Sequence, residues 1–495
     1  MEKAGGVEQF AAVVQTIREK NPNHAVLSAG DMVGATPLLS ALFKDEPTIE
    51  AMNLIGVDFH AVGNHEFDYG IAHLKRLKNG GCALNNQTNQ PDCGGREPYK
   101  GADFPFLAAN VIETATGKPL FPPYGVKAFE GVKIAFIGLT LKETSAIVRP
   151  GGTQGVDFRD EVTTVNELIP VLKAQGIEAI VVIVHEGGEQ IGGINDCTNF
   201  KGPLKTIAEK LDRAVDVIVS AHTHRYYVCE IDGKLVTSAG SYGTLITDID
   251  LALNRNTRDI VAKHATNRVV NPAGQKDARL TALVDRYSTL AEPLEKRVIA
   301  KVLQELPTLS NPAGESLLGN LIADAHLFVT VAPDKGGAVI AFNNPGSLRA
   351  SLIPGPNGNV SYGDLFKVQP FQNELITMTL TGTQIKAVLE QQFAGERPRI
   401  LGVSKGFSYT WDNKRPNGDK VLRASLKLNG TTIQSDLQYR VTTNSFIAGG
   451  SEGLSIFREG TERQTGMLDL EALATYLGAQ SPYSPPAQGR ITRID

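Results

Sequence analysis

Two histidines separated by one residue carry the clearest chemical signal in this chain. His222 and His224 lie in the segment SAHTH, which directly follows the apolar run VDVIV. Imidazole is the commonest protein metal ligand, and two imidazoles so spaced at the end of a strand can both turn toward one site. Polar residues also follow apolar segments in the sequences GD (Gly30, Asp31) and GNHE (63–66). Together these residues predict one metal site.

The residue types at these strand ends suit a pair of divalent cations. A two-metal site needs a bridging carboxylate together with neutral nitrogen and amide-oxygen ligands, and it places a bridging hydroxide in line with a phosphorus atom. We expect Asp31 to bridge the two metals. The other expected ligands are Asn64, His185 and His222 on one metal and His224 on the other. Metal identity stays open, because this mixed set suits Zn, Mn, Fe or Co.

A candidate proton donor lies next to these ligands. His65 follows Asn64, which places its imidazole to donate to a leaving oxygen, and Asp68 three residues on can hold the ring. A lone histidine is more often a structural polar residue than a catalytic one. Here several polar groups converge on strand ends, which favours the catalytic interpretation.

Alternating apolar and amphipathic stretches must position these residues. Strands are predicted in the segments AVLSAGD, VDFHAVGNHE, VKIAFIGLT, EAIVVIVHEGG and VDVIVSAHTH, and helices over residues 6–19, 48–54, 161–176 and 204–213. Such alternation predicts an α/β sheet with helices on its faces. In these sheets ligands bind at the loops beyond the strand ends, which is where the candidate ligands fall.

The length of 495 residues exceeds what one core usually supports, so two domains are expected. The pattern changes around residues 255–300, where polar segments and a charged amphipathic stretch predict a connecting helix. We therefore expect a metal-binding domain over 1–262, a linker helix over 263–298 and a second domain over 299–495. The second domain is predicted to mix strands and helices, as in LLGNLIADAHL and AVIAFNNPGSLR.

Composition and charge narrow the possible partners. The chain is 41% hydrophobic and 21% charged, as in a soluble globular protein, and 49 Lys and Arg against 53 Asp and Glu give a net charge of −4. No basic block could track a nucleic-acid polymer or an anionic membrane. The longest apolar runs, over 132–141 and 177–184, are too short to span a bilayer, and the start MEKAGG lacks a signal-peptide pattern.

The four cysteines point to another compartment. Cys82 and Cys93 bracket an Asn-rich loop, while Cys197 and Cys229 flank the histidine pair. This spacing suits two disulfides, 82 with 93 and 197 with 229, better than a zinc motif; reduced, inert thiols are the alternative. Disulfides imply an exported protein, which conflicts with the missing signal peptide.

The motifs GD, GNHEFD, VVIVHEGG and SAHTH, followed by NNPGSLR, QPF and NSFIAGGSEG, resemble the 5'-nucleotidase family of metallophosphoesterases, in particular its bacterial secreted branch. The resemblance runs over essentially the whole chain. It implies an N-terminal four-layer α/β/β/α metallophosphoesterase sandwich, a helical linker, and a C-terminal α/β nucleotide-binding domain, with the active site in the cleft between the domains. It also implies the metal ligands named above and a catalytic dyad of His65 and Asp68.

The resemblance further implies substrate contacts in the second half. Asn344 and Arg349 match the family's substrate-binding loop, and Phe371 and Phe446 match two aromatics that sandwich the base, a contact tolerant of base identity. Glu452 stands where the family has an Asp that contacts the nucleoside. Without the resemblance, the two phenylalanines would be ordinary core residues and Arg349 a surface ion-pair partner.

Three departures from the family pattern matter. The family begins with a strand ending in Asp-x-His, which supplies two ligands to the metal held by His224, and nothing before Gly5 resembles it. A start placed too late would remove leader, strand and ligands together and place the protein in the periplasm, on the cell surface or outside the cell; a natural short form is the alternative. In addition, LSNPAGESLLGNL lacks arginines that the family often uses for the phosphate. Finally, Ser451 and Glu452 replace a Gly and an Asp.

The expected function is a metal-dependent phosphomonoesterase that hydrolyses nucleoside 5'-monophosphates with a bridging hydroxide as nucleophile. Alternatives within the family are nucleotide-sugar and 2',3'-cyclic nucleotide hydrolysis, because pocket shape decides among them. A nucleotide-binding protein without turnover is the alternative of another class, because a site lacking two ligands would hold a single metal. The expected partner is the nucleotide substrate, and the oligomeric state is not specified by the sequence.

Overall fold

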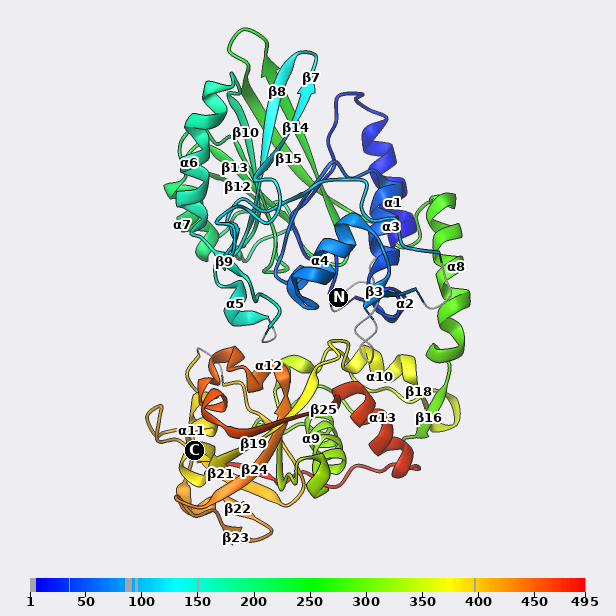
Figure 1. The fold of residues 1–495 in the computed structure, drawn as a ribbon, viewed down its shortest axis with the longest axis vertical. Helices are drawn as coiled ribbons and strands as arrows, with labels where there is room; N and C mark the ends of the chain where they lie inside the picture. The colour runs from blue at the N-terminus through cyan, green and yellow to red at the C-terminus, as the bar shows by residue number, and fades with distance from the viewer. Residues whose placement is uncertain are drawn as a thin grey trace. The chain divides into compact units, whose positions relative to one another are not determined.

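The computed structural model describes residues 6–34, 36–84, 91–93, 97–148, 151–395 and 398–494. The chain divides into two compact units, one formed by Met1–Gly34 with Leu39–Ser288 and the other by Ala35–Leu38 with Thr289–Asp495 (Figure 1).

A six-stranded sheet forms the largest element of unit 1. Its strand order is β12 (Tyr226–Ile231), β13 (Lys234–Ala239), β11 (Val217–Ser220), β10 (Ala179–His185), β8 (Val132–Thr140) and β7 (Tyr124–Phe129). The four inner strands are parallel, and β7 and β12 are antiparallel edges. All seven residues of β10 are buried, which explains why residues 180–184 are an unbroken β-branched run rather than an alternating pattern.

A smaller parallel sheet packs against it. Its order is β1 (Leu27–Ser28), β2 (Phe59–Ala61) and β5 (Phe106–Leu107). Apolar residues from both sheets fill the space between them, and the rings of Phe59 and Phe136 stack at 4.9 Å between centroids. The antiparallel hairpin β14 (Leu245–Asn254) and β15 (Asp259–Val269) adds Ile260 and Ala265 to this core.

Helices cover the outer faces of both sheets. Helices α6 (Glu161–Ala174) and α7 (Pro203–Lys210) pack on the larger sheet, and α3 (Glu46–Ile55) and α4 (Gly70–Asn79) pack near the smaller one. Figure 1 shows α6 and α7 on one side of the strands and α1 (Val7–Arg18), α3 and α4 on the other. Unit 1 therefore has the expected four layers, α/β/β/α.

Helix α8 (Ala278–Glu295) follows the hairpin. The sequence predicts a linker helix from residue 263, whereas residues up to Val269 belong to β15 and the helix begins at Ala278. The outer face of this strand is solvated, so its sequence is as polar as that of a connector. Among the described residues, none of the helices is both long enough and apolar enough to cross a bilayer.

Unit 2 is built on a five-stranded mixed sheet. Its order is β20 (Gly402–Val403), β17 (Ile340–Asn343), β24 (Gln438–Asn444), β19 (Glu374–Thr381) and β25 (Thr461–Leu468). Helices α9 (Leu317–Thr330), α11 (Gly382–Gln391) and α13 (Asp469–Ala479) accompany it. A second sheet has the order β23 (Thr431–Thr432), β22 (Lys427–Leu428), β21 (Phe407–Asp412) and β26 (Ile491–Ile494). The α/β class predicted for this half is confirmed.

Shorter elements complete the description. The helices are α2 (Leu38–Ala41), α5 (Thr144–Ile147), α10 (Tyr362–Val368) and α12 (Ser445–Ala448). The strand pairs are β3 (Ala83–Leu84) with β4 (Pro91–Asp92), β6 (Val111–Glu113) with β9 (Val156–Phe158), and β16 (Val298–Lys301) with β18 (Asn359–Ser361).

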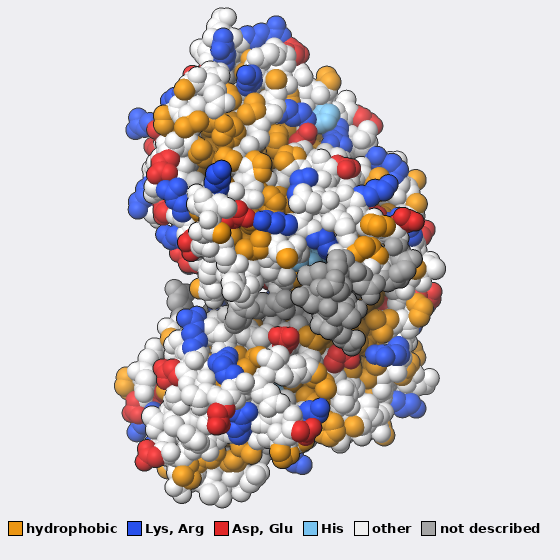
Figure 2. Space-filling model, in the orientation of Figure 1, with side chains coloured by type: hydrophobic (Ala, Val, Ile, Leu, Met, Phe, Trp, Pro, Cys, Tyr) orange, Lys and Arg blue, Asp and Glu red, His pale blue; other side chains and the backbone are white. Residues whose placement is uncertain are grey.

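Both expected disulfides are present. Cys82 bonds Cys93 with 4.8 Å between Cα atoms, and Cys197 bonds Cys229 with 5.1 Å. Part of the Asn-rich loop between the first pair, residues 85–90, lies outside the described residues. On the face drawn in Figure 2, basic side chains are interspersed with acidic ones rather than gathered into one patch, in line with the mixed charge of the sequence.

Candidate metal centre

Four of the predicted metal ligands meet at the carboxyl ends of neighbouring strands. Asp31 follows β1, Asn64 follows β2, His185 ends β10 and His222 follows β11. Asp31 Oδ2 lies 2.9 Å from His185 Nε2. Asn64 Oδ1 lies 3.1 Å from His185 Nε2 and 3.0 Å from His222 Nδ1. The ligand atoms of Asp31, His185 and His222 all fall within 4.8 Å of one another.

The protonation of His185 shows that this cluster fits a cation. Its Nδ1 lies 2.7 Å from the Ala29 carbonyl oxygen and must donate a proton there. Its Nε2 then faces oxygens of Asp31 and Asn64, which accept rather than donate. A neutral ring presents only a lone pair to those oxygens, so either a second proton or a shared cation is needed. A carboxylate, an amide oxygen and two imidazoles are a ligand set that transition metals accept.

The pKa shifts of the clustered side chains also favour a cation site. Burial acts to lower the pKa of His185, but the Asp31 carboxylate outweighs it and raises that pKa. Burial acts to raise the pKa of Asp31, and His185 reverses this and lowers it. Burial, followed by the neighbouring His185, lowers the pKa of His222 to about 4. His222 is therefore neutral near pH 7, which is the form that binds metals.

Three candidate ligands have a strained backbone. Asp31, His222 and His224 adopt φ values of 56°, 67° and 56°, in the left-handed region. For residues with a Cβ atom this conformation costs about 1 kcal/mol or more, and it persists only where the surroundings impose it. Other described residues away from the site share this conformation, but its presence at three candidate ligands is what a preorganised centre would require.

Two glycines allow the loops to approach one another. A Cβ atom on Gly30 would lie 2.4 Å from His185 Nδ1, and one on Gly63 would lie 2.3 Å from Asp31 Oδ1. Neither position can accept a side chain without moving a candidate ligand. This explains the glycines of the GD and GNHE motifs.

Glu66 holds two of the ligand loops together. Its carboxylate accepts hydrogen bonds from the backbone nitrogens of Asp31 (3.0 Å), Met32 (2.9 Å) and Gly63 (2.7 Å), and the residue is 1% exposed. The sequence motifs alone predict no role for Glu66. Its signal in the sequence is its position after Asn64 and His65 in GNHE, but the three hydrogen bonds that it accepts come from backbone groups, which no side-chain motif reveals.

The two residues of the predicted dyad lie in contact, and their catalytic role stays a prediction. His65 Nδ1 lies 2.6 Å from Asp68 Oδ2, and the His65 backbone nitrogen donates to Asp31 Oδ1 at 2.9 Å. Burial acts to lower the pKa of His65, but the Asp68 carboxylate outweighs it and raises this pKa to about 10. A cation held by the adjacent Asn64 would oppose this rise by charge repulsion.

His224 differs from the other candidate ligands. It is exposed, and its ring lies edge-on to that of Tyr242 with 5.4 Å between centroids. Among the described residues, it is not part of the ligand cluster formed by Asp31, His185 and His222. Its role at a second metal stays a prediction.

The candidate substrate residues of unit 2 form two contacts. Asn344 is buried and donates from Nδ2 to Glu452 Oε1 at 3.0 Å. The Arg349 guanidinium lies over the ring of Phe371, 5.6 Å from its centroid. Phe446 is half-buried and packs against the core of unit 2.

Comparison with known families supports the resemblance. Residues 3–226 match the calcineurin-like phosphoesterase family, and residues 298–459 match the 5'-nucleotidase C-terminal domain. The class of protein is therefore a metallophosphoesterase with a second, nucleotidase-type domain.

Individual relatives and one solved structure resemble the chain over nearly its whole length. The chain is 33% identical to endonuclease YhcR of Bacillus subtilis over 98% of its own length, which is 38% of that protein. It is 25% identical to human 5'-nucleotidase over 98% of this chain and 85% of the human protein. The structure of a 5'-nucleotidase precursor from Thermus thermophilus superimposes with a TM-score of 0.74 at 27% identity, covering 99% of this chain and 94% of that one.

The chain belongs to the 5'-nucleotidase family of metallophosphoesterases. It spans 38% and 60% of the first two curated relatives, endonuclease YhcR and the cell wall protein Lmo0130 of Listeria monocytogenes. This class of enzyme uses divalent metals, and the cluster at Asp31, His185 and His222 provides part of such a site.

Proposed function

We propose that the protein hydrolyses nucleoside 5'-monophosphates to a nucleoside and phosphate with the help of divalent cations. The observation that carries this proposal is the convergence of Asp31, Asn64, His185 and His222, whose contacts of about 3 Å place a ligand set suited to a divalent cation at one point. When bound, a pair of cations would supply a hydroxide nucleophile and stabilise charge on the phosphoryl oxygens.

In this proposal, side chains of unit 1 bind the cations and transfer a proton. Asp31 would hold both cations, Asn64, His185 and His222 would hold one of them, and His224 would hold the other. Because Asp68 holds Nδ1 of His65, we assign to Nε2 the transfer of a proton to the departing nucleoside oxygen.

Unit 2 supplies the substrate contacts in this proposal. Arg349 pairs with the phosphate, Phe371 and Phe446 stack on the base, and Asn344 with Glu452 contacts the nucleoside. The cation–π contact of Arg349 with Phe371 supports a shared role, because it places a phosphate ligand beside a stacking ring. The metal-binding and substrate-binding functions are assigned to residues 1–262 and 299–495, joined by 263–298.

We propose an extracellular, periplasmic or cell-surface location on the basis of the disulfides and of one relative. Two disulfides persist only in an oxidising compartment in most organisms. One relative that matches 92% of this chain is a cell wall protein.

Phosphodiester hydrolysis is the second candidate. The relative at 33% identity is an endonuclease, and another, at 26% identity, is a trifunctional nucleotide phosphoesterase of Bacillus subtilis. The absence of arginines from residues 309–321 favours it, because fewer charges then select the dianionic phosphate of a monoester.

The test compares substrates on one metal-reconstituted preparation. Protein freed of metal with EDTA is assayed with Mn²⁺ or Zn²⁺ for phosphate release from AMP, and for cleavage of 2',3'-cyclic AMP, a nucleotide sugar and bis-p-nitrophenyl phosphate. We expect metal-dependent release from AMP, at least about 100-fold lower in His185→Asn. His264→Asn, at an exposed histidine of β15, is the matched control and should retain activity.

Each alternative has its own outcome. Cleavage of the diesters without release from AMP would replace the proposal with the second candidate. Nucleotide binding without turnover of any substrate would show a binding protein.

A further inference from the structure

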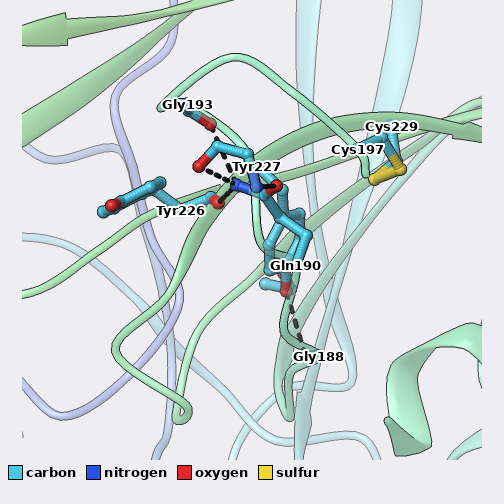
Figure 3. The surroundings of a disulfide bond; sticks show 9 residues. Gly188, Gln190, Gly193, Cys197, Tyr226, Tyr227 and Cys229 are labelled. Atoms are coloured by element: carbon cyan, nitrogen blue, oxygen red, sulfur yellow. Dashed lines mark hydrogen bonds between the residues drawn. A yellow bond between two sulfur atoms is a disulfide. The ribbon is translucent and has the colours of Figure 1, made fainter. Parts of the chain in front are cut away.

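The loop that follows His185 is bonded along its length to the segment that carries the histidine pair. This loop, residues 186–202, joins β10 to α7, and the disulfide Cys197–Cys229 connects it to β12 (Figure 3). Gln190 Nε2 donates to the Tyr226 carbonyl oxygen at 3.1 Å, and the Val228 nitrogen donates to the Asp196 carbonyl at 3.3 Å. The two histidine-bearing segments are therefore fixed to each other outside the site itself.

Gly188 is the centre of this connection. Its N–H donates to the Tyr227 hydroxyl at 3.2 Å (Figure 3). Its carbonyl oxygen accepts from Thr223 Oγ1 at 2.7 Å. A Cβ atom at this position would lie 2.5 Å from the Phe200 ring, so the close approach requires glycine. Both polar backbone groups of the residue are used by the segment from 220 to 229.

The donors and acceptors around the Tyr227 hydroxyl can be assigned. Ser220 Oγ donates its single proton to the Thr237 carbonyl oxygen at 2.7 Å, so at its 2.7 Å contact with Tyr227 it accepts. Tyr227 therefore donates to Ser220 and accepts from Gly188. The Tyr227 side chain is fully buried. Its hydroxyl accepts from Gly188 in the β10 loop and donates to Ser220 of β11, which in turn donates to Thr237 of β13.

Thr223 links these hydrogen bonds to the histidine pair. It is the single residue between His222 and His224, both of which have left-handed backbones. Such a turn needs support from its surroundings, and the Thr223 hydroxyl anchors its middle residue to Gly188. We propose that Gly188, Thr223 and Tyr227 form a clamp that holds the histidine pair in its metal-binding geometry. This inference rests on the proposed function, and the three are positioning residues that do not touch the substrate.

The test measures metal affinity rather than activity alone. Mn²⁺ binding to the full chain is followed by isothermal titration calorimetry for wild type, Thr223→Val and Tyr227→Phe, each of which removes one hydroxyl and little volume. We expect each Kd to rise about 10-fold or more, the range seen when partners of metal ligands are removed. Thr223→Ser, which keeps a hydroxyl, should restore affinity to within about twofold of wild type. Because both hydroxyls act on Gly188, the double variant should lose less than the product of the single losses.

Tyr99→Phe is the matched control. Tyr99 is also buried in unit 1, and its hydroxyl donates to the Leu77 carbonyl oxygen of α4, a helix with no candidate ligand. Its removal should lower thermal stability while leaving the Mn²⁺ Kd unchanged. If Tyr227→Phe folds poorly, the half-exposed Thr223 still provides the comparison of Val with Ser. Wild-type affinity in Thr223→Val and Tyr227→Phe would overturn the clamp alone, whereas the absence of Mn²⁺ binding by wild type would overturn both the clamp and the proposed function.

Discussion

At the scale of single residues, His65 has the arrangement expected of a proton donor. It is held by Asp68 at 2.6 Å, it directly follows the candidate ligand Asn64, and its side chain keeps 30% of its surface exposed. Exposure matters here because a proton donor must reach the substrate, whereas a purely structural histidine gains nothing from it.

We predict that His65→Ala lowers kcat for AMP by about 10²- to 10⁴-fold, the usual contribution of general acid catalysis. The number of bound Mn²⁺ ions should not change, because His65 is not among the expected ligands. Asp68→Asn should cause a smaller loss, because an amide can still hold the ring without stabilising its charge. Steady-state kinetics with metal counting distinguish this role from a ligand role. Loss of metal together with activity would contradict it.

The residue types allowed part of the site to be predicted. Asp31, Asn64, His185 and His222 each follow an apolar run, so parallel strand ends had to bring them together. Glu66 and Tyr227 were not predictable, because each accepts hydrogen bonds from backbone nitrogens of a loop that is far away in the sequence. Their importance depends on tertiary geometry that no spacing encodes.

At the scale of elements, the first turn of α13 contains a carboxyl group in an unfavourable environment. Asp469 is 1% exposed, and burial raises its pKa to about 7 although the Leu470 nitrogen donates to it. Between about pH 4 and pH 7, Asp469 is therefore protonated in the native state and ionised in the unfolded state. The contribution of Asp469 to the free energy of unfolding is therefore largest below pH 4, and it is lost as the pH rises toward 7.

Asp469→Asn should remove this pH dependence. The amide has the same shape but does not ionise, so the variant should be more stable than wild type at pH 8, by at most about 4 kcal/mol, and similar to it near pH 4. Urea unfolding at the two pH values, followed by tryptophan fluorescence, measures the difference. The exposed Asp436→Asn in the same unit is the control and should shift stability by less than about 0.5 kcal/mol at either pH. Equal effects of Asp469→Asn at both pH values would contradict the prediction.

Elements were easier to predict where burial was complete. The run AIVVIVH has only buried positions, so its sequence shows a strand without ambiguity. Strand β15 has buried residues such as Ile260 and Ala265 among exposed polar ones, and its polar face made it look like the start of a linker. A strand with one solvated face lacks the continuous signal of a central parallel strand.

At the scale of the whole molecule, the two units offer separate spectroscopic reports. The chain has one tryptophan, Trp411, which is buried in the core of unit 2 and donates from its ring nitrogen to the Ala313 carbonyl oxygen at 3.0 Å. The candidate metal cluster lies in unit 1. Tryptophan fluorescence thus follows the unfolding of unit 2, while far-ultraviolet circular dichroism follows both units.

We predict that Mn²⁺ stabilises unit 1 selectively. A ligand present at 100 times its Kd adds about 2.7 kcal/mol to the stability of the state that binds it, which corresponds to roughly 5–10 °C for a unit of this size. The melting transition seen only by circular dichroism should therefore rise with Mn²⁺ and fall with EDTA, and the fluorescence transition should stay in place. His222→Ala should abolish the rise, because it removes a ligand from the cluster. If both transitions moved together, the units would unfold as one cooperative body, and if neither moved, the cluster would not be a metal site.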